Sequence, residues 1–258
     1  MDVDGLKRSE IYDLVYADRV ADVEYYRTCT RDSFSAGGRR AIELGAGTGR
    51  VLVPTAASVP GMRFLALERD ADRLALLQEK CRAAGLENVS SLCADMVSFC
   101  VPEEVDLVTA PFRVLQYCVD MSSLETVLRN VWLALRPGGM FIFDLFNPSI
   151  PVLGRSSGPA TFEYWLHSAR IERTVEVVDR SLFDQTQRIE ETYLVCPASG
   201  SSSTFSYGYT TRFFFRDEVV LALCQAGFTT DRVKGSFEGE PFGEAPYPGE
   251  LIFEARKE

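Results

Sequence analysis

The stretch AIELGAGTGRVLVP, residues 41–54, contains the residue pattern in this sequence that could do chemistry. It starts as an apolar run, places Gly45, Gly47 and Gly49 at every second position, and then continues as apolar sequence. A glycine-rich turn between a strand and a helix lets the backbone approach a nucleotide closely. Several classes of enzyme use such turns, so the spacing and the neighbouring charges must identify the ligand.

The spacing of these glycines disfavours a dinucleotide cofactor. The pattern is G-x-G-x-G, whereas the dinucleotide fingerprint is G-x-G-x-x-G, which speaks against a nicotinamide-dependent oxidoreductase. Glu43 stands just before the loop, where its carboxylate would repel a diphosphate. A carboxylate there suits a cationic ligand, such as a sulfonium compound that carries an α-amino group. We include Ala46, inside the loop, among the residues that bind this ligand.

Two further acids follow predicted strands. Glu68 ends one strand, and its carboxylate can accept hydrogen bonds from both hydroxyls of a ribose. Asp95 follows the next strand and can accept one from an adenine amine, while Met96 offers its backbone N–H and an apolar face to the ring. We place Arg69, beside Glu68, at the same ligand. The alternative for both acids is that they are solvated strand ends.

The elements that would position these residues alternate between strand and helix. We expect strands at 41–44, 62–67, 89–94, 105–109 and 140–146, and helices in the first forty residues and at 51–58, 70–85 and 124–135. This alternation predicts a mainly parallel sheet with helices on both faces, which binds its ligand at the carboxyl ends of the strands. Glu68, Asp95, the stretch after Thr109 and Asp144 would therefore line one crevice.

The pattern changes after residue 150. Apolar and polar residues alternate from 161 to 215, which predicts an antiparallel insertion at about 155–212 attached to the core. A further helix precedes two short strands, at 228–234 and 250–256, which bring the core sheet to seven strands. His167, the single histidine, lies in the insertion, where an ordinary packed or exposed residue is favoured over a catalyst.

Together these segments make the sequence similar to the class I S-adenosylmethionine-dependent methyltransferases. The similarity is carried by ELGAGTGR, LALERD, CADM, LRPGGMFIFD and FRDEVVLALCQAGF, and it spans about residues 10–256. It implies an α/β, Rossmann-like methyltransferase fold with a mainly parallel seven-stranded sheet and an antiparallel β insertion. The implied single domain, 1–258, consists of an N-terminal helical lid (1–40), a cofactor-binding half (41–150), the insertion (155–212) and the end of the core sheet (213–258).

More narrowly, the sequence resembles a small-molecule branch that has this insertion after the fifth strand and includes N-methyltransferases of amino sugars and other natural products. IYDLVYAD and APFRVLQYCVD resemble the lid and the post-fourth-strand segment of that branch. The resemblance implies that Tyr12, Tyr16 and Pro111 contact the cofactor. It implies that the acceptor contacts Phe112, Arg113, Gln116 and Tyr117.

The acid–base group of this branch is replaced or absent in the sequence. Some amino-sugar enzymes have a histidine where Tyr117 stands, so Tyr117, Tyr16 and Asp144 are the candidates for a catalytic role. Two of the three have a structural alternative, because Tyr16 can belong to a core stripe and Asp144 can be a solvated strand end. TAPF stands where an Asn/Asp-Pro-Pro-aromatic motif would be, which speaks against amide or adenine N-methylation.

The expected reaction is therefore methyl transfer from S-adenosylmethionine to a small-molecule acceptor, with nitrogen preferred. O-methylation of a small molecule, a protein or RNA methyltransferase, and a non-catalytic cofactor-binding subunit remain alternatives. The net charge of −10 argues against a nucleic-acid partner. Seven cysteines without a C-x-x-C pair, and no carboxylate cluster after the fourth strand, predict neither a metal site nor disulfides. We expect a cytoplasmic monomer or homodimer without a signal peptide or membrane span.

Overall fold

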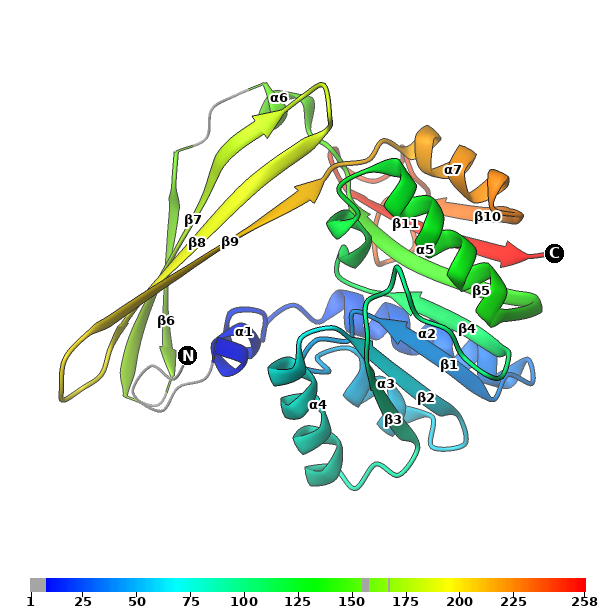
Figure 1. Ribbon diagram of the computed structural model, residues 1–258, viewed down its shortest axis with the longest axis horizontal. Helices are drawn as coiled ribbons and strands as arrows, with labels where there is room; N and C mark the ends of the chain where they lie inside the picture. Colours follow the sequence, from blue (N-terminus) through cyan, green and yellow to red (C-terminus); the bar gives the residue numbers. More distant parts are fainter. Residues whose placement is uncertain (1–7, 155–157, 167) are drawn as a thin grey trace. The chain divides into compact units, whose positions relative to one another are not determined.

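The computed structural model describes residues 8–154, 158–166 and 168–258, and His167 lies outside these residues. The chain divides into two compact units, whose elements are labelled in Figure 1. The larger unit comprises Arg19–Asn147 and Phe214–Glu258. The smaller unit comprises the chain up to Asp18 together with Pro148–Phe213. Each unit has its own sheet and its own buried core.

The larger unit is built on a seven-stranded sheet with the strand order β10-β11-β5-β4-β1-β2-β3. Its strands are β1 (Arg40–Leu44), β2 (Arg63–Glu68), β3 (Val89–Cys93), β4 (Val105–Ala110), β5 (Leu135–Phe146), β10 (Phe228–Lys234) and β11 (Glu250–Lys257). The first five are parallel, and β11 pairs antiparallel with both β5 and β10. The direction of the strand order reverses between β1 and β4, where sheets of this kind bind ligands.

Helices cover both faces of this sheet (Figure 1), which confirms the predicted fold class. They are α2 (Ala21–Ser35), α3 (Leu52–Ser58), α4 (Ala71–Ala83), α5 (Met121–Ala134) and α7 (Arg216–Gln225). Ile42 of β1 packs with α5 and α7, whereas Ala41 packs with α2, α3 and α4. Successive strand residues point to opposite faces, so Glu43 points the same way as Ala41. Asp144, two residues past Ile142 of the second cluster, also faces α2.

Side-chain caps define where two of these helices begin. The carboxylate of Asp70 accepts hydrogen bonds from two backbone N–H groups in the first turn of α4. The carboxylate of Asp120 accepts one in the first turn of α5. Such caps satisfy donors that have no partner inside the helix. Gly85 follows α4 in the left-handed conformation, with φ of 65°, and ends it.

The smaller unit contains a four-stranded antiparallel sheet in the order β6-β7-β8-β9. Its elements are α1 (Arg8–Val15), α6 (Ile150–Leu153), β6 (Ala160–Leu166), β7 (Ala169–Ser181), β8 (Thr186–Cys196) and β9 (Ser203–Arg212). Ile11 of α1 is buried against Ile171, Tyr193 and Val195 on one face of the sheet. The predicted antiparallel insertion is thereby confirmed, and α1 is part of its core.

A buried carboxylate organises polar groups on this face of the smaller sheet. Glu191 accepts hydrogen bonds from Nε of Arg173 (2.9 Å) and from the hydroxyls of Tyr193 (2.7 Å), Tyr207 (3.1 Å) and Tyr209 (2.8 Å). Burial opposes ionisation, but Arg173 and the hydroxyls outweigh it and lower the pKa of Glu191. The carboxylate is therefore charged and fully used by protein donors.

Several local features differ from the predicted elements. The helical N-terminal segment divides between the two units, because α1 belongs to the smaller unit and α2 to the larger. The RPGG turn lies within β5, where the register against β4 shifts between Val105 and Leu107. A 3₁₀ turn, η1 (Val114–Tyr117), follows β4. None of the helices in the described ranges combines the length and apolar character that crossing a membrane requires.

Candidate active site at the glycine loop

The glycine loop connects the end of β1 to α3, and its glycines face different surroundings. Gly45 and Gly47 have φ of 62° and 57°, in the left-handed region that favours glycine. A Cβ atom on Gly45 would collide with Cγ2 of Val114, so η1 packs directly on the backbone there. A Cβ atom on Gly47 would meet only the carbonyl oxygen of Gly45, 3.8 Å away. The loop is therefore packed at Gly45 and open at Gly47.

The open position is tied to the neighbouring strand by Glu68. One oxygen of this carboxylate accepts a hydrogen bond from the Gly47 N–H at 2.9 Å, and the other accepts one from the Asp70 N–H at 2.9 Å. The backbone N–H of Ala46 also donates to the carbonyl of Leu67 at 3.0 Å. Each carboxylate oxygen can accept more than one hydrogen bond. Glu68 thus shapes the loop and can still accept from a ligand.

Glu43 is a buried residue of β1 whose carboxylate reaches the first residue of α3. The backbone N–H of Leu52 donates to its carboxylate. Burial raises the pKa of Glu43 to about 8, and the charge of Asp22 adds to this effect, although Arg50 and the Leu52 N–H oppose it. A ligand that brings a positive charge to this position would favour the ionised form.

A second group of predicted residues meets where β2 and β3 end. The guanidinium of Arg69 lies 3.6 Å from the carboxylate of Asp95 and 5.7 Å from the ring centroid of Tyr117. Met96 is half-buried against the cluster that contains α5. The structure thus brings Tyr117, expected at the acceptor, next to Arg69, which is expected at the cofactor and pairs with Asp95. Tyr117 and Arg69 present flat, partly exposed groups beside Asp95, as a planar ring ligand requires.

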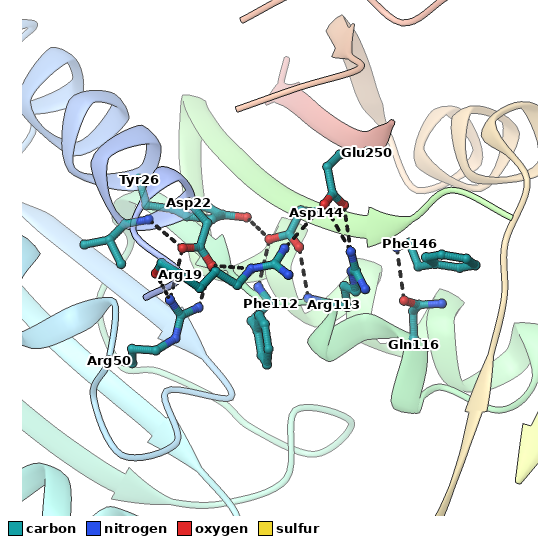
Figure 2. Close-up of polar contacts among 11 residues, drawn as sticks. Arg19, Asp22, Tyr26, Arg50, Phe112, Arg113, Gln116, Asp144, Phe146 and Glu250 are labelled. Carbon is teal, nitrogen blue, oxygen red and sulfur yellow. Dashed lines mark hydrogen bonds and ion pairs between the residues drawn. The ribbon is translucent and has the colours of Figure 1, made fainter. Parts of the chain in front are cut away.

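Two arginines bind the buried carboxylate of Asp22 near the glycine loop (Figure 2). Arg50 contacts both oxygens, at 3.0 and 2.5 Å. Arg19 is more loosely held, at 3.4 Å from Asp22 and 3.4 Å from Glu250, and its side chain is 30% exposed. Both guanidinium groups lie over the ring of Phe112, 5.0 and 4.8 Å from its centroid. Arg19 therefore retains donors that can face an anionic ligand group.

The residues after β4 form a turn whose backbone N–H groups donate hydrogen bonds to Asp144. Pro111 is buried, and Phe112 and Arg113 then adopt φ of 60° and 62°. Asp144 is fully buried and accepts hydrogen bonds from the N–H groups of Phe112 (2.8 Å) and Arg113 (3.2 Å) and from the hydroxyl of Tyr26 (2.6 Å). This burial does not suit a base that touches the acceptor.

The same turn directs two side chains toward the end of β5 (Figure 2). Nη2 of Arg113 lies 3.1 Å from both carboxylate oxygens of Glu250. The buried Gln116 accepts a hydrogen bond from the Phe146 N–H at 3.1 Å. Nε of Arg113 is buried and has no hydrogen-bond partner within the described part of the chain.

Tyr12 and Tyr16 belong to the smaller unit, on α1 and directly after it. Their rings lie 4.8 Å apart, one helical turn from each other. The hydroxyl of Tyr16 accepts a hydrogen bond from Nη2 of Arg173 at 3.1 Å. Arg173 in turn binds Glu191, so this tyrosine is connected to the polar cluster of the smaller sheet.

Sequence analysis did not identify the residues that α2 contributes. Asp22 and Tyr26 lie four positions apart, so they share one face of the helix, where they reach Arg50 and Asp144. The available signal was two polar groups at helical spacing on an otherwise apolar stripe. Arg19 and Glu250 had no local signal, because each is defined by partners far away in the sequence.

Comparison with known proteins identifies the segment that contains the glycine loop. Residues 41–139 match the family described as "Methyltransferase domain". No curated protein matches the sequence. Solved structures match it over nearly the whole chain, and their TM-scores show a common fold at low sequence identity.

Three of these structures illustrate the similarity. The sugar N-methyltransferase KedS8 from Streptoalloteichus sp. ATCC 53650 is 22% identical, with a TM-score of 0.76 over 100% of this chain and 97% of that one. DesVI of Streptomyces venezuelae is 17% identical, with a TM-score of 0.78 over 98% and 99%. CalS10, an amino pentose methyltransferase from Micromonospora echinaspora involved in calicheamicin biosynthesis, is 21% identical, with a TM-score of 0.74 over 96% and 97%.

The segment matched to the family contains the glycine loop, Glu43, Glu68, Asp95 and the turn after β4. The expected methyltransferase assignment is therefore confirmed. Residues 41–139 match a methyltransferase domain, within a chain that has the fold of the S-adenosylmethionine-dependent methyltransferases.

Proposed function

We propose that this protein transfers the methyl group of S-adenosylmethionine to a nitrogen atom of a small-molecule acceptor. The observation that carries this proposal is the open side of Gly47, in a loop that follows the buried acid Glu43 of β1 and is hydrogen-bonded to Glu68 at the end of β2. When bound, the cofactor supplies an electrophilic methyl on a positively charged sulfur. The remaining question is which residues would hold each part of it.

The amino-acid end of the cofactor carries one ammonium and one carboxylate, and the site offers a partner for each. Glu43, whose carboxylate is buried beside the loop, suits the ammonium. Arg19, with long ion-pair distances and a partly exposed side chain, suits the carboxylate. Charge-assisted hydrogen bonds of this kind are shorter and stronger than neutral ones. The predicted contact of Tyr12 and Tyr16, which belong to the smaller unit, with the cofactor stays a prediction.

The nucleoside end would be held by residues at the ends of β2 and β3. Glu68 suits the ribose hydroxyls, and Asp95 suits the adenine amine. Arg69 and Tyr117 would lie against the flat faces of the base, with Met96 on its apolar side. This assigns Tyr117 to the cofactor in preference to acid–base catalysis, because its ring lies beside Arg69, which in turn pairs with Asp95.

The acceptor would bind at the turn after β4, against Phe112, Arg113 and Gln116. Two observations support an amine as the acceptor. The similar structures KedS8 and CalS10 are described as a sugar N-methyltransferase and an amino pentose methyltransferase. The site also has few groups that could deprotonate a hydroxyl. A neutral amine needs no base before it attacks a methyl group.

We place the enzyme in a reducing cytoplasm, since all seven of its cysteines are free.

Transfer of radiolabelled methyl from S-adenosylmethionine tests the proposal. The purified protein is incubated with pools of small amines, with small alcohols and phenols, and with protein and RNA fractions. We expect label in the amine pools and release of S-adenosylhomocysteine. Label confined to alcohols would change the acceptor class, and label confined to protein or RNA would refute a small-molecule acceptor. Tight S-adenosylhomocysteine binding without transfer to any pool would identify a non-catalytic subunit.

A matched pair of variants assigns the activity to this site. Glu68→Gln keeps the size of the side chain but replaces one acceptor oxygen with a donor, so we expect weaker cofactor binding. Glu79→Gln makes the same change at an exposed position of α4 and should behave like the wild type. Equal cofactor binding by both variants would argue against the proposed ribose contact.

A further inference from the structure

The turn after β4 adopts a conformation that neither of its residues favours. Phe112 and Arg113 are consecutive, carry side chains, and both have φ near 60°. Residues other than glycine persist in this region only where the surrounding structure holds them there. The question is which groups hold this turn, and what depends on it.

Asp144 supplies the restraint with both of its oxygens. Oδ1 accepts from the Phe112 N–H at 2.8 Å and Oδ2 accepts from the Arg113 N–H at 3.2 Å. The hydroxyl of Tyr26 donates to Oδ1 at 2.6 Å. An ionised carboxylate presents acceptors alone to both N–H groups, whereas a protonated acid or an amide carries a donor on one of its two terminal atoms and so suits this pair of N–H groups less well.

The conformation of the turn determines where its side chains lie. The ring of Phe112 lies beneath the guanidinium groups of Arg19 and Arg50. The guanidinium of Arg113 binds Glu250 at 3.1 Å and lies 5.3 Å from the centroid of the Phe146 ring. If the turn relaxed, both side chains would leave these positions together.

We propose that Asp144, supported by Tyr26, is a positioning residue whose carboxylate fixes the Phe112–Arg113 turn and so shapes the acceptor side of the site. This inference rests on the proposed function for its consequence, since the turn is assigned to the acceptor there. The restraint itself is a property of the fold and can be measured without any methyl transfer.

The charges around Asp144 determine when the restraint operates. Burial raises its pKa to about 6, and the charge of Glu250 on β11 adds to this. The Tyr26 hydroxyl on α2, the charge of Arg113 and the Phe112 N–H all lower it. The carboxylate is therefore ionised, and the turn held, above about pH 6. Below that pH the protonated acid loses one of its two contacts with the turn.

Amide resonances of the turn test the restraint directly. In protein labelled with ¹⁵N-phenylalanine and ¹⁵N-arginine, the Phe112 and Arg113 amides should shift together with pH, with one midpoint near 6. Asp144→Asn should abolish this titration. Tyr26→Phe should move the midpoint to higher pH, because it removes a hydrogen bond to the ionised form, and it keeps the test available if Asp144→Asn does not fold. Amides that do not titrate in the wild type, or that titrate unchanged in Asp144→Asn, would overturn the proposal.

Kinetics test the consequence, with Asp217→Asn on the exposed start of α7 as the matched control. Asp144→Asn should raise the KM for the acceptor at least fivefold and raise the dissociation constant for S-adenosylmethionine by a smaller factor, because the ring of Phe112 also lies beneath Arg19. In the wild type this KM should rise below pH 6, and Asp144→Asn should lack that limb. A variant that weakens cofactor and acceptor binding by the same factor would overturn positioning of the acceptor. Absence of any transfer by the wild type would refute the proposed function alone, since the amide titration stands independently.

Discussion

Alanine substitutions at three glycines would separate the conformational, packing and ligand-binding roles of the loop. Gly45, Gly47 and Gly85 have nearly equal φ values, of 62°, 57° and 65°. An alanine in this left-handed region costs on the order of 1–2 kcal/mol of stability. At Gly85 a Cβ atom would meet nothing within 4 Å, so Gly85→Ala measures this conformational cost alone.

The other two substitutions add different effects to the same conformational cost. At Gly45 the new methyl group would collide with Val114, and overpacking of this kind costs about 1–3 kcal/mol more. Gly45→Ala should therefore destabilise the protein by about 2–5 kcal/mol. Gly47→Ala should match Gly85→Ala in stability, since no side chain opposes the methyl group. Only Gly47→Ala should place a methyl group where the cofactor is proposed to bind.

Thermal unfolding and calorimetric titration with S-adenosylhomocysteine measure the two effects. We expect Gly47→Ala to weaken binding by about 5- to 150-fold, which corresponds to a steric cost of ~1–3 kcal/mol. Gly85→Ala should bind like the wild type. Val114→Ala should recover part of the stability lost in Gly45→Ala by removing the collision. Equal affinities of Gly47→Ala and Gly85→Ala for the ligand would refute the placement of the cofactor on the open side of the loop.

Three further predictions concern charges. The pKa of Glu43 is raised to about 8 in the folded protein, so this residue contributes its full stability below the unfolded pKa near 4.5 and loses that contribution as the pH rises toward 8. Glu43→Gln should therefore flatten the dependence of the unfolding temperature on pH between these values. Binding of S-adenosylhomocysteine at pH 7 should release protons from the wild type but not from the variant. Arg19→Ala should weaken S-adenosylhomocysteine binding by about 10- to 150-fold, as expected for loss of ~1.5–3 kcal/mol, but leave binding of methylthioadenosine, which lacks the carboxylate, unchanged; equal losses for both ligands would contradict the assignment. Glu191→Gln should destabilise the protein by about 3–5 kcal/mol because Arg173 is left buried without its partner, whereas Glu190→Gln, on the exposed side of the same strand, should change the unfolding temperature little.

The alternation of strands and helices could be predicted because the relevant signals are local. Buried parallel strands are apolar runs, and α4 is delimited by an acidic cap at Asp70 and by Gly85. The register of the sheet then places Glu68 and Asp95 at one edge, as expected. Local signals fail where packing decides, as in the N-terminal helical segment, whose two helices belong to different units.

The parts of the site that could not be predicted depend on contacts between distant residues. Nothing in the letters of APFRV indicates two left-handed residues, because the conformation is held by Asp144, more than thirty positions away. Tyr117 could be placed after the fourth strand, but its proximity to Arg69 depends on how η1 packs on Gly45. The role of Arg19 likewise depends on carboxylates from α2 and β11.

These arrangements bear on how the site would promote methyl transfer. Among the described carboxylates with raised pKa values, Glu43 and Asp144 are both buried and both already accept hydrogen bonds from backbone N–H groups. Neither is free to act as a base toward an acceptor, and both point to the α2 face, where Asp22 and Tyr26 reach them or their partners. Displacement at a sulfonium methyl needs alignment of nucleophile and leaving group more than proton transfer, and alignment can supply ~7–11 kcal/mol of a barrier. The buried acids are therefore best understood as groups that fix the conformation of the two loops, one at the proposed cofactor position and one at the proposed acceptor position.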